Sequence, residues 1–546
     1  MNQFSKYFSF LCAASAIAGH AAAHYEENVK IERTSLEKNV FVDIDKTFPN
    51  ILKVKDFGAI PDDGKDDTAA IANAIKAAAS KEGSRLVLNK GIYDVGMAGT
   101  GDYFRISDAK NLLIDGGGAK FLLHRVGCLF TIADCQNVRL GDFEVDMKNT
   151  PFLGGVVSAT GDGWFEMKAV PPHKVGNDLD ARVLLGYDRL LGCFDGVQYQ
   201  KTFPDGTKAE KVADDTLRIP CHGNPPMLGK ALVLRHQVYG GGVCRAMDSR
   251  NVLFKNIRVY GCAGMGLRGS ACENIAIDGF KVKPAEGFWM SLTADASHFN
   301  CTRGTVEIFN SDFESMGDDA TNIHSMYWLV EKSDGKLLTL SFAKDPARPA
   351  PLHSAPKAGD TLEIPSPNNY MRPETYAKIA NVTQSADKRR LIVEIEGDLS
   401  AQLTVGMPLS VKEYRPLVRI NNCTVSNVRP RGFLIQTTDA LVENCFFKNT
   451  MAMAILIEAD MDYWGESAAS DKITISHCTF EDVNPWKRNG QVAVVASARY
   501  KKGLPFAGNI HGKIIVKNCT FVRCGPEPIL LQYVETPITA NNEVTQ

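Results

Sequence analysis

An asparagine followed by a cysteine recurs between short apolar runs in the second half of the chain. The pair stands at four places, the third with histidine in place of asparagine: Asn422-Cys423, Asn444-Cys445, His477-Cys478 and Asn518-Cys519. The interval from Cys423 to Cys445 is 22 residues, and the interval from Asn251 to Asn274 is 23. A period in this range is typical of solenoids whose coils must stack to bury their inner faces. The repeat therefore predicts an all-β fold, specifically a right-handed parallel β-helix.

The same repeat decides how the cysteines are interpreted. The chain has 14 cysteines, and 13 remain if a leader containing Cys12 is removed. A disulfide framework would not be expected to repeat its neighbours in this way, whereas small buried thiols stacked on successive coils would. We therefore predict that the cysteines are mostly free and packed in the core.

Residues 52–93 have the pattern of a strand, a loop, a helix and a second strand. Ile71, Ile75 and Ala78 mark one apolar face of the expected helix, and Gly83 stands just past its end. The segment resembles the N-terminal part of secreted parallel β-helix proteins, including polygalacturonases and phage tailspikes. In those proteins the helix caps the first coil, so we expect an N-terminal capping helix here.

Residues 155–240 and 326–415 interrupt the coil period. Both stretches contain short strand patterns separated by turn residues, which is typical of small antiparallel β modules. Insertions in repeat proteins usually map to one face, often the binding face. The expected organisation is a signal peptide at 1–23, a lead-in at 24–50, β-helix segments at 51–154, 241–325 and 416–546, and inserted modules at 155–240 and 326–415.

The first 23 residues have the composition of an export signal. Lys6 precedes an apolar stretch rich in small residues, and Ala21-Ala22-Ala23 offers a cleavage site before His24. We expect the mature protein to be exported, either to the periplasm or as a secreted protein.

The overall charge argues against one class of partner. The chain carries 61 basic and 63 acidic residues, with a formal net charge of −2. A nucleic-acid partner held by bulk charge is therefore not expected. No apolar run reaches the roughly 18–20 residues of a membrane helix, so no membrane span is expected. The sequence leaves homo-oligomerisation open.

Three aspartates bracket a short strand pattern at 306–309. Asp295 precedes it, and Asp318 and Asp319 follow it in one Gly-Asp-Asp sequence. Because Asp295 and Asp318 are 23 residues apart, we expect them at equivalent positions on adjacent coils. Carboxylates placed in this way would lie roughly 5–9 Å apart, which suits glycoside hydrolysis by two carboxylates. Like-charge repulsion would raise at least one pKa, leaving one proton donor beside one or two bases.

The same residues allow two other interpretations. A Gly-Asp-Asp sequence alone is typical of a turn in which aspartates bond to local backbone groups. A metal site built from Asp and His is the second, but the spacing matches no ligand motif that we can define. We therefore expect no metal and no cofactor.

Several motifs around the acids resemble glycoside hydrolase family 110, the exo-acting α-1,3-galactosidases. They are DASHF at 295–299, CTRG at 301–304, GDDATNIH at 317–324, RPRGFLIQTT at 429–438, ALVENCFFKNT at 440–450 and AILIEADMDYWGES at 454–467. The resemblance implies an inverting hydrolase that releases terminal α-linked galactose from glycans without a metal. It implies Asp295 as the general acid, with Asp318 and Asp319 holding the attacking water. GFWMSLTAD before the acid and MDYWGES differ from the family's form, so the sugar stays open.

Polar and aromatic residues near these motifs are candidates for substrate binding. They are His298, Asn322, His324, Arg431, Glu458, Trp464 and Glu466. Trp464 could stack on the apolar face of a sugar or pack within its loop, and the two glutamates could accept hydroxyl hydrogen bonds. Arg431 could bind substrate or pair with the acids. Asn322 could line the site or belong to an asparagine ladder.

Two other functions fit a β-helix. A polygalacturonase-like pectin hydrolase also places aspartates on adjacent coils, but the chain lacks Asn-Thr-Asp, Gly-His-Gly and Arg-Ile-Lys. A non-enzymatic carbohydrate-binding solenoid would keep its affinity for sugar after the loss of any one aspartate. We rank both below an exo-glycosidase.

Overall fold

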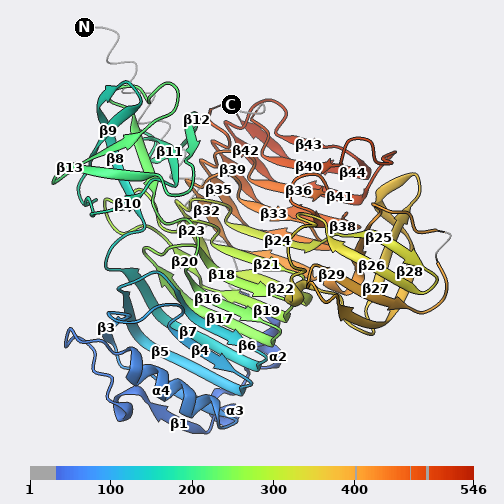
Figure 1. Ribbon diagram of the computed structural model, residues 1–546, viewed down its shortest axis with the longest axis horizontal. Helices are drawn as coiled ribbons and strands as arrows, with labels where there is room; N and C mark the ends of the chain where they lie inside the picture. Colours follow the sequence, from blue (N-terminus) through green and yellow to red (C-terminus); the bar gives the residue numbers. More distant parts are fainter. Residues whose placement is uncertain (1–31, 400–401, 468, 487–490, 546) are drawn as a thin grey trace.

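A computed structural model describes residues 32–399, 402–467, 469–486 and 491–545, so the export signal predicted at 1–23 lies outside the described residues. The described chain forms a right-handed parallel β-helix that carries two antiparallel modules (Figure 1). The predicted fold class is therefore confirmed. No helix in the described ranges is long and apolar enough to cross a membrane.

Two long sheets build the coils, and the larger has 20 strands among the described residues. Between residues 50 and 282 these strands are β1 (Asn50–Lys53), β2 (Ser84–Val87), β3 (Gly91–Val95), β5 (Lys110–Leu123), β7 (Gln136–Met147), β17 (Arg250–Val259), β19 (Glu273–Asp278) and β20 (Lys281–Val282). The others are β22 (Arg303–Phe309), β23 (Asp312–Glu314), β31 (Leu417–Asn421), β32 (Thr424–Ser426), β34 (Asp439–Glu443), β35 (Phe446–Lys448), β38 (Lys472–Ser476), β39 (Thr479–Glu481), β41 (His511–Lys517), β42 (Thr520–Val522), β44 (Val534–Ala540) and β45 (Glu543–Thr545).

The smaller sheet has 11 strands in the same part of the chain, and it carries the candidate site. They are β4 (Phe104–Ser107), β6 (Cys128–Ala133), β16 (Gly242–Met247), β18 (Met265–Ser270), β21 (Ser297–Asn300), β24 (Thr321–Met326), β33 (Phe433–Ile435), β36 (Ile455–Asp460), β37 (Glu466–Ser467), β40 (Val494–Arg499) and β43 (Ile529–Leu531). All pair in parallel except β37, which runs antiparallel to β24 and β36.

The Asn-Cys repeat forms a corner of the coil. Asn422 follows the last residue of β31, and the next strand, β32, begins two residues later. Its φ of 55° lies in the left-handed region, which asparagine tolerates better than most residues. The other three copies of the pair have φ values of 52° to 54° at the same corner: Asn444, His477 and Asn518. The asparagine therefore makes the bend, and the cysteine that follows turns inward.

The core is a column of apolar side chains inside the coils. The 13 cysteines among the described residues are all free and buried, which confirms the prediction. Phe480 stacks between Phe447 and Phe521, with ring centroids 5.0 and 4.8 Å apart. Stacking of identical side chains on successive coils is what a repeat of this length requires.

Short helices cover the N-terminal end and one outer face. In α4 (Thr68–Ala79) the predicted face of Ile71, Ile75 and Ala78 is buried against the first coils. Two further helices, α2 (Ser35–Asn39) and α3 (Ile44–Thr47), lie in the lead-in, where Leu36 packs on Leu253 of the larger sheet. The remaining helical turns are of the 3-10 type: η1 (Val54–Phe57), η2 (Leu352–Ser354) and η3 (Lys412–Tyr414).

The two insertions are both antiparallel and lie on different sides of the solenoid (Figure 1). The first is an eight-stranded sheet: β8 (Phe152–Gly161), β9 (Trp164–Ala169), β10 (Leu179–Asp180), β11 (Val183–Asp188), β12 (Cys193–Thr202), β13 (Lys208–Ala213), β14 (Thr216–Pro220) and β15 (Ala231–Arg235). The second is a closed barrel: β25 (Trp328–Asp334), β26 (Leu337–Phe342), β27 (Thr361–Ser366), β28 (Asn369–Gln384), β29 (Arg390–Ile395) and β30 (Pro408–Val411).

Candidate active site

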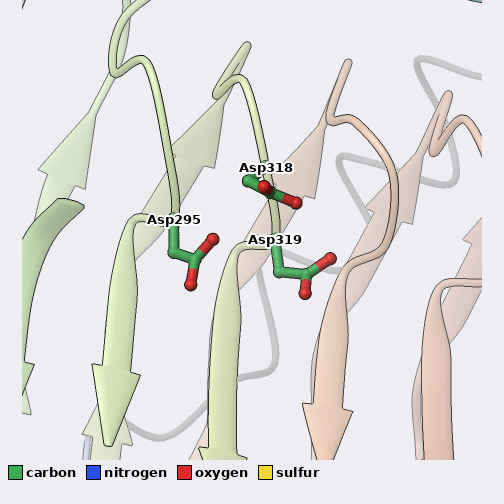
Figure 2. A group of neighbouring side chains, drawn as sticks. All are labelled: Asp295, Asp318 and Asp319. Atoms are coloured by element: carbon green, nitrogen blue, oxygen red, sulfur yellow. The ribbon is translucent and has the colours of Figure 1, made fainter. Parts of the chain in front are cut away.

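Two of the three aspartates occupy the same position on adjacent coils. Asp295 stands two residues before β21, and Asp319 stands two residues before β24. Ser297 pairs with Thr321, so Asp319 is the counterpart of Asp295. The prediction that Asp318 is that counterpart was wrong, because this coil is one residue longer than the 23-residue spacing assumed. Figure 2 shows Asp295 and Asp319 at neighbouring strand starts, with Asp318 on the preceding loop.

Three carboxylates converge in front of these strand starts. Asp295, Asp318 and Asp319 each offer an oxygen within 4.8 Å of the others. Asp295 and Asp319 are buried, whereas the Asp318 side chain keeps 26% of its accessible area. Gly317 permits the close approach of the two loops, because a Cβ there would lie 2.7 Å from the Thr293 carbonyl oxygen. The Gly-Asp-Asp sequence therefore brings two coils together.

Asp295 lies in surroundings that favour its neutral form. Burial raises the pKa of this carboxyl well above its ordinary value, and the charge of Asp318 adds to the rise. Its Oδ2 atom lies 2.7 Å from Nδ1 of His298. Burial also lowers the pKa of His298, so a neutral ring faces the carboxyl.

The two predicted histidines contact each other. Nε2 of His298 lies 2.9 Å from Nε2 of His324, whose Nδ1 lies 2.8 Å from the carbonyl oxygen of Ser325. Burial lowers the pKa of His324 as well. Glu466 approaches the same ring, with Oε1 3.7 Å from Nε2 of His324. A continuous chain of contacts therefore runs from Asp295 through both rings to a backbone carbonyl.

Asp319 has a different partner. Arg431 donates from Nε to Oδ1 at 2.9 Å and from Nη2 to Oδ2 at 2.7 Å, a bidentate ion pair. Burial raises the pKa of Asp319 to about 7, and the Arg431 guanidinium opposes the rise. Of the two interpretations of Arg431, the structure supports pairing with an acid. Asp318 has only a looser cation nearby, Arg429, at 3.9 Å.

The other predicted binding residues differ in whether their side chains already have partners within the protein. Asn322, on β24, pairs in register with His298 on β21. The buried Oδ1 of Asn322 has no hydrogen-bond partner among the described residues. Glu458 already accepts from Ser497 at 2.8 Å and lies 3.3 Å from Nε of Arg499. Trp464 is partly exposed, with the ammonium of Lys344 4.0 Å above its ring. Asn322 is therefore the freest of these groups to accept a substrate hydroxyl.

Several residues in the site were missed by the sequence analysis. Arg235, the last residue of β15, donates from Nη1 to the carbonyl oxygens of Thr293 at 2.5 Å and Gly317 at 3.1 Å. It therefore braces both acid-bearing loops from the first inserted module. Tyr239 has an exposed ring and interacts electrostatically with Asp318 and Asp295. No local motif marks either residue, because Arg235 ends the last strand of the inserted module and Tyr239 lies in the segment that follows it.

Arg268 is a third residue that the motifs did not indicate. Arg268 lies on β18 and pairs in register with His298 on the neighbouring strand β21. Burial lowers the pKa of Arg268. No ion pair of Arg268 forms within the described part of the chain. A half-buried guanidinium without a carboxylate partner is free to bind oxygen atoms of a ligand.

The three carboxylates are also the cluster in the described ranges that could hold a cation. Arg431, however, already occupies both oxygens of Asp319. The donor set is therefore better suited to proton transfer than to coordination.

Comparisons with known proteins agree with the fold and with the motifs. The family described as "Right handed beta helix region" matches residues 412–546. Alpha-1,3-galactosidase A of Shewanella woodyi is 24% identical over 84% of this chain and 80% of its own length. Alpha-1,3-galactosidase B of Bacteroides thetaiotaomicron is 24% identical over 79% of this chain and 75% of its own.

Solved structures are more distant. The A-module of a mannuronan C-5 epimerase from Azotobacter vinelandii covers 91% of this chain and 96% of its own, at 10% identity and a TM-score of 0.38. The sequence relatives are the more informative comparison. They confirm that this chain resembles the α-1,3-galactosidases, and the resemblance is consistent with glycoside hydrolase family 110.

Proposed function

We propose that this chain is an exo-glycosidase that hydrolyses terminal α-1,3-linked galactose from glycans with inversion at the anomeric carbon. The observation that carries the proposal is the pairing of two unlike carboxyls. Asp295 is buried beside a neutral histidine, and Asp319, its counterpart one coil away, is held by Arg431. One group is suited to give a proton, and the ion pair with Arg431 favours the charged form of the other against the rise in pKa that burial causes. The names of the relatives supply the sugar and linkage.

Asp295 acts as the general acid. Its raised pKa favours the protonated carboxyl to a higher pH than in an ordinary aspartate. The proton passes from Asp295 to the glycosidic oxygen as the bond between that oxygen and the anomeric carbon breaks. The bonding pair of that C–O bond stays on the departing oxygen, which becomes the hydroxyl of the leaving group.

Asp318 and Asp319 hold the attacking water. Both oxygens of Asp319 already accept charge-assisted hydrogen bonds from Arg431, which fixes the orientation of this carboxylate. Asp318 is more exposed, and its nearest cation, Arg429, lies 3.9 Å away. Asp318 is therefore the freer group to take a proton from water, while Asp319 orients that water.

Groups around the acids bind the terminal sugar. The unpartnered Oδ1 of Asn322 can accept a hydroxyl, and Arg268 can donate to one. Tyr239 adds aromatic surface near the same acids, and Trp464 adds it two residues before Glu466, although Lys344 lies over the Trp464 ring. We also propose that the protein is exported, on the strength of the leader-like composition at 1–23.

Proton NMR of α-1,3-galactobiose during hydrolysis tests the proposal. The expected first product is β-galactose, which then mutarotates. If α-galactose appears first, the inverting mechanism is wrong. If neither this sugar nor other α-linked galactosides and pectic fragments are cleaved while sugar binding persists, the non-enzymatic solenoid is the better account.

A further inference from the structure

The chain of contacts behind Asp295 ends at a group that can only accept hydrogen bonds. The carbonyl oxygen of Ser325 lies 2.8 Å from Nδ1 of His324, so Nδ1 carries the hydrogen. Burial lowers the pKa of His324, which keeps the ring neutral. A neutral imidazole has one N–H and one lone pair, so Nε2 of His324 is an acceptor.

The next two hydrogen bonds then have only one direction. The 2.9 Å contact between the Nε2 atoms requires His298 to donate, because Nε2 of His324 has no hydrogen. With His298 also neutral, its Nδ1 holds a lone pair. The 2.7 Å contact from that Nδ1 to Oδ2 of Asp295 therefore requires the hydrogen to lie on the carboxyl.

We propose that His324 and His298 are positioning residues that lock one another's tautomers and thereby hold a proton on Asp295. The proposal assigns them a role other than the sugar contact expected from the sequence. As a statement about catalysis it rests on the proposed function of Asp295 as general acid. As a statement about proton positions it does not.

The alternative arrangement is an ion pair in which the proton lies on Nδ1 of His298. Charged groups face this point from several elements. Asp318, Asp319 and Glu466 favour a charged His298, and Arg431 favours an ionised Asp295, so these effects favour the ion pair. Against it, Asp318 and Glu466 favour a neutral Asp295, and Arg268 favours a neutral His298. Arg235 and Tyr239 also interact with Asp295; at His324, Glu466 favours a charged ring and Lys344 a neutral one. Burial of Asp295 and near-burial of His298 disfavour separated charge, and burial is the largest influence on each pKa.

This fixed arrangement of hydrogens on Asp295, His298 and His324, called the lock below, has a chemical consequence for the reaction. To protonate the departing oxygen, Asp295 gives up the hydrogen bond from its O–H to Nδ1 of His298; the O–H bond then breaks and the bonding pair remains on the carboxylate. That carboxylate then faces the lone pair of Nδ1 on His298, a repulsive arrangement. The site therefore favours rapid return of a proton from water to Asp295 before the next turnover.

The variants His324→Leu and His324→Gln separate this role from others. Leucine removes the acceptor, so His298 is free to carry hydrogen on Nδ1 and to donate to an ionised Asp295. Glutamine can still accept at the position of Nε2. We expect the alkaline limb of the pH profile of kcat/KM for α-1,3-galactobiose to lie about one pH unit lower in His324→Leu than in the wild type. The reason is that the hydrogen bond between His298 and Asp295 would then stabilise the ionised carboxyl in place of the protonated one. We expect His324→Gln to keep the wild-type limb and both variants to keep the wild-type KM.

His173→Leu is the matched control. His173 is another buried histidine, in the first inserted module, and burial lowers its pKa to about 4. Its ring nitrogens have no hydrogen-bond partner among the described residues. This variant should leave the alkaline limb unchanged. Raised KM with an unmoved limb in His324→Leu would overturn the lock in favour of sugar binding. Lower thermal stability with an unmoved limb would overturn it in favour of a structural role.

Nitrogen-15 NMR of histidine-labelled protein tests the lock without any substrate. We expect neutral rings at pH 7, with the hydrogen on Nε2 in His298 and on Nδ1 in His324, assigned by loss of signals in the His324→Gln variant and in His298→Asn. A hydrogen on Nδ1 of His298 would overturn the proposal even if the enzyme is active. The predicted tautomers in a protein that cleaves no glycoside would support the lock and reject the proposed function.

Discussion

Asp295 and Asp319 occupy the same register position on adjacent coils, yet their surroundings differ. Both are buried; a side chain engages one carboxyl oxygen of Asp295 and both oxygens of Asp319. The partner of Asp295 is a neutral ring that ends a chain at a backbone carbonyl, and the partner of Asp319 is a guanidinium. The repeat sets where the two carboxyls stand, and the partner sets which of them carries a proton. One repeated position can therefore supply an acid on one coil and, on the next, a carboxylate that orients the water.

The largest expected effect comes from removing the acid of the first coil. In Asp295→Asn the amide cannot protonate the glycosidic oxygen. We expect kcat/KM for α-1,3-galactobiose to fall by about 10²–10⁴-fold, the range of general acid catalysis. Initial rates by galactose release measure it, with sugar affinity by calorimetry as the control for folding. Activity within a few-fold of the wild type would contradict the assignment of Asp295 as the general acid that distinguishes the two coils.

Removing the cation of the second coil should act mainly on stability. Arg431→Met leaves the buried Asp319 without its partner, which we expect to cost about 3–5 kcal/mol of unfolding free energy at pH 8. Loss of the guanidinium raises the pKa of Asp319 further, so the cost should shrink as the pH falls and the carboxyl is protonated. Urea unfolding at pH 8 and pH 5 measures this, with Arg431→Lys as the charge-retaining control. An equal loss at both pH values would contradict the assignment.

The smallest expected effect is a gain in stability. Because the pKa of Asp295 is raised on folding, the folded state binds more protons than the unfolded state above about pH 4. The stability of the wild type is therefore fully present below that pH and declines as the pH rises toward the folded pKa. Asp295→Asn has no such group and should melt higher than the wild type at pH 7. Thermal melts at pH 4 and pH 7 should show the difference only at pH 7, and a variant less stable at both values would refute it.

The fold was predictable because its signal is local and repeated. Each Asn-Cys pair combines a residue that tolerates a positive φ with a small side chain that turns inward, as at Asn422 and Cys423. The capping helix was predictable from the spacing of Ile71, Ile75 and Ala78. These properties depend on neighbours in sequence, so a pattern of residues was sufficient to reveal them.

The site was predictable only in part. The aspartates and histidines cluster within 30 residues, and the motifs mark them. The register did not follow from the spacing, because the loop that carries Asp318 adds one residue to the coil. Arg235 reaches the site from the inserted module, 58 residues before Thr293 whose carbonyl it contacts. Such contacts depend on how an insertion folds back, which no local pattern records.

The measurement that tests the central claim most directly is the dependence of kcat/KM on the leaving group. A series of aryl α-galactosides with leaving-group pKa values from about 4 to 10 would be cleaved by the wild type, Asp295→Asn and Asp318→Asn. If Asp295 is the proton donor, its variant should become steeply slower as the leaving group becomes more basic. The wild type and Asp318→Asn should show shallow, parallel lines. A shallow line for Asp295→Asn, or a steep one for Asp318→Asn, would contradict the assignment of acid and base to the two coils.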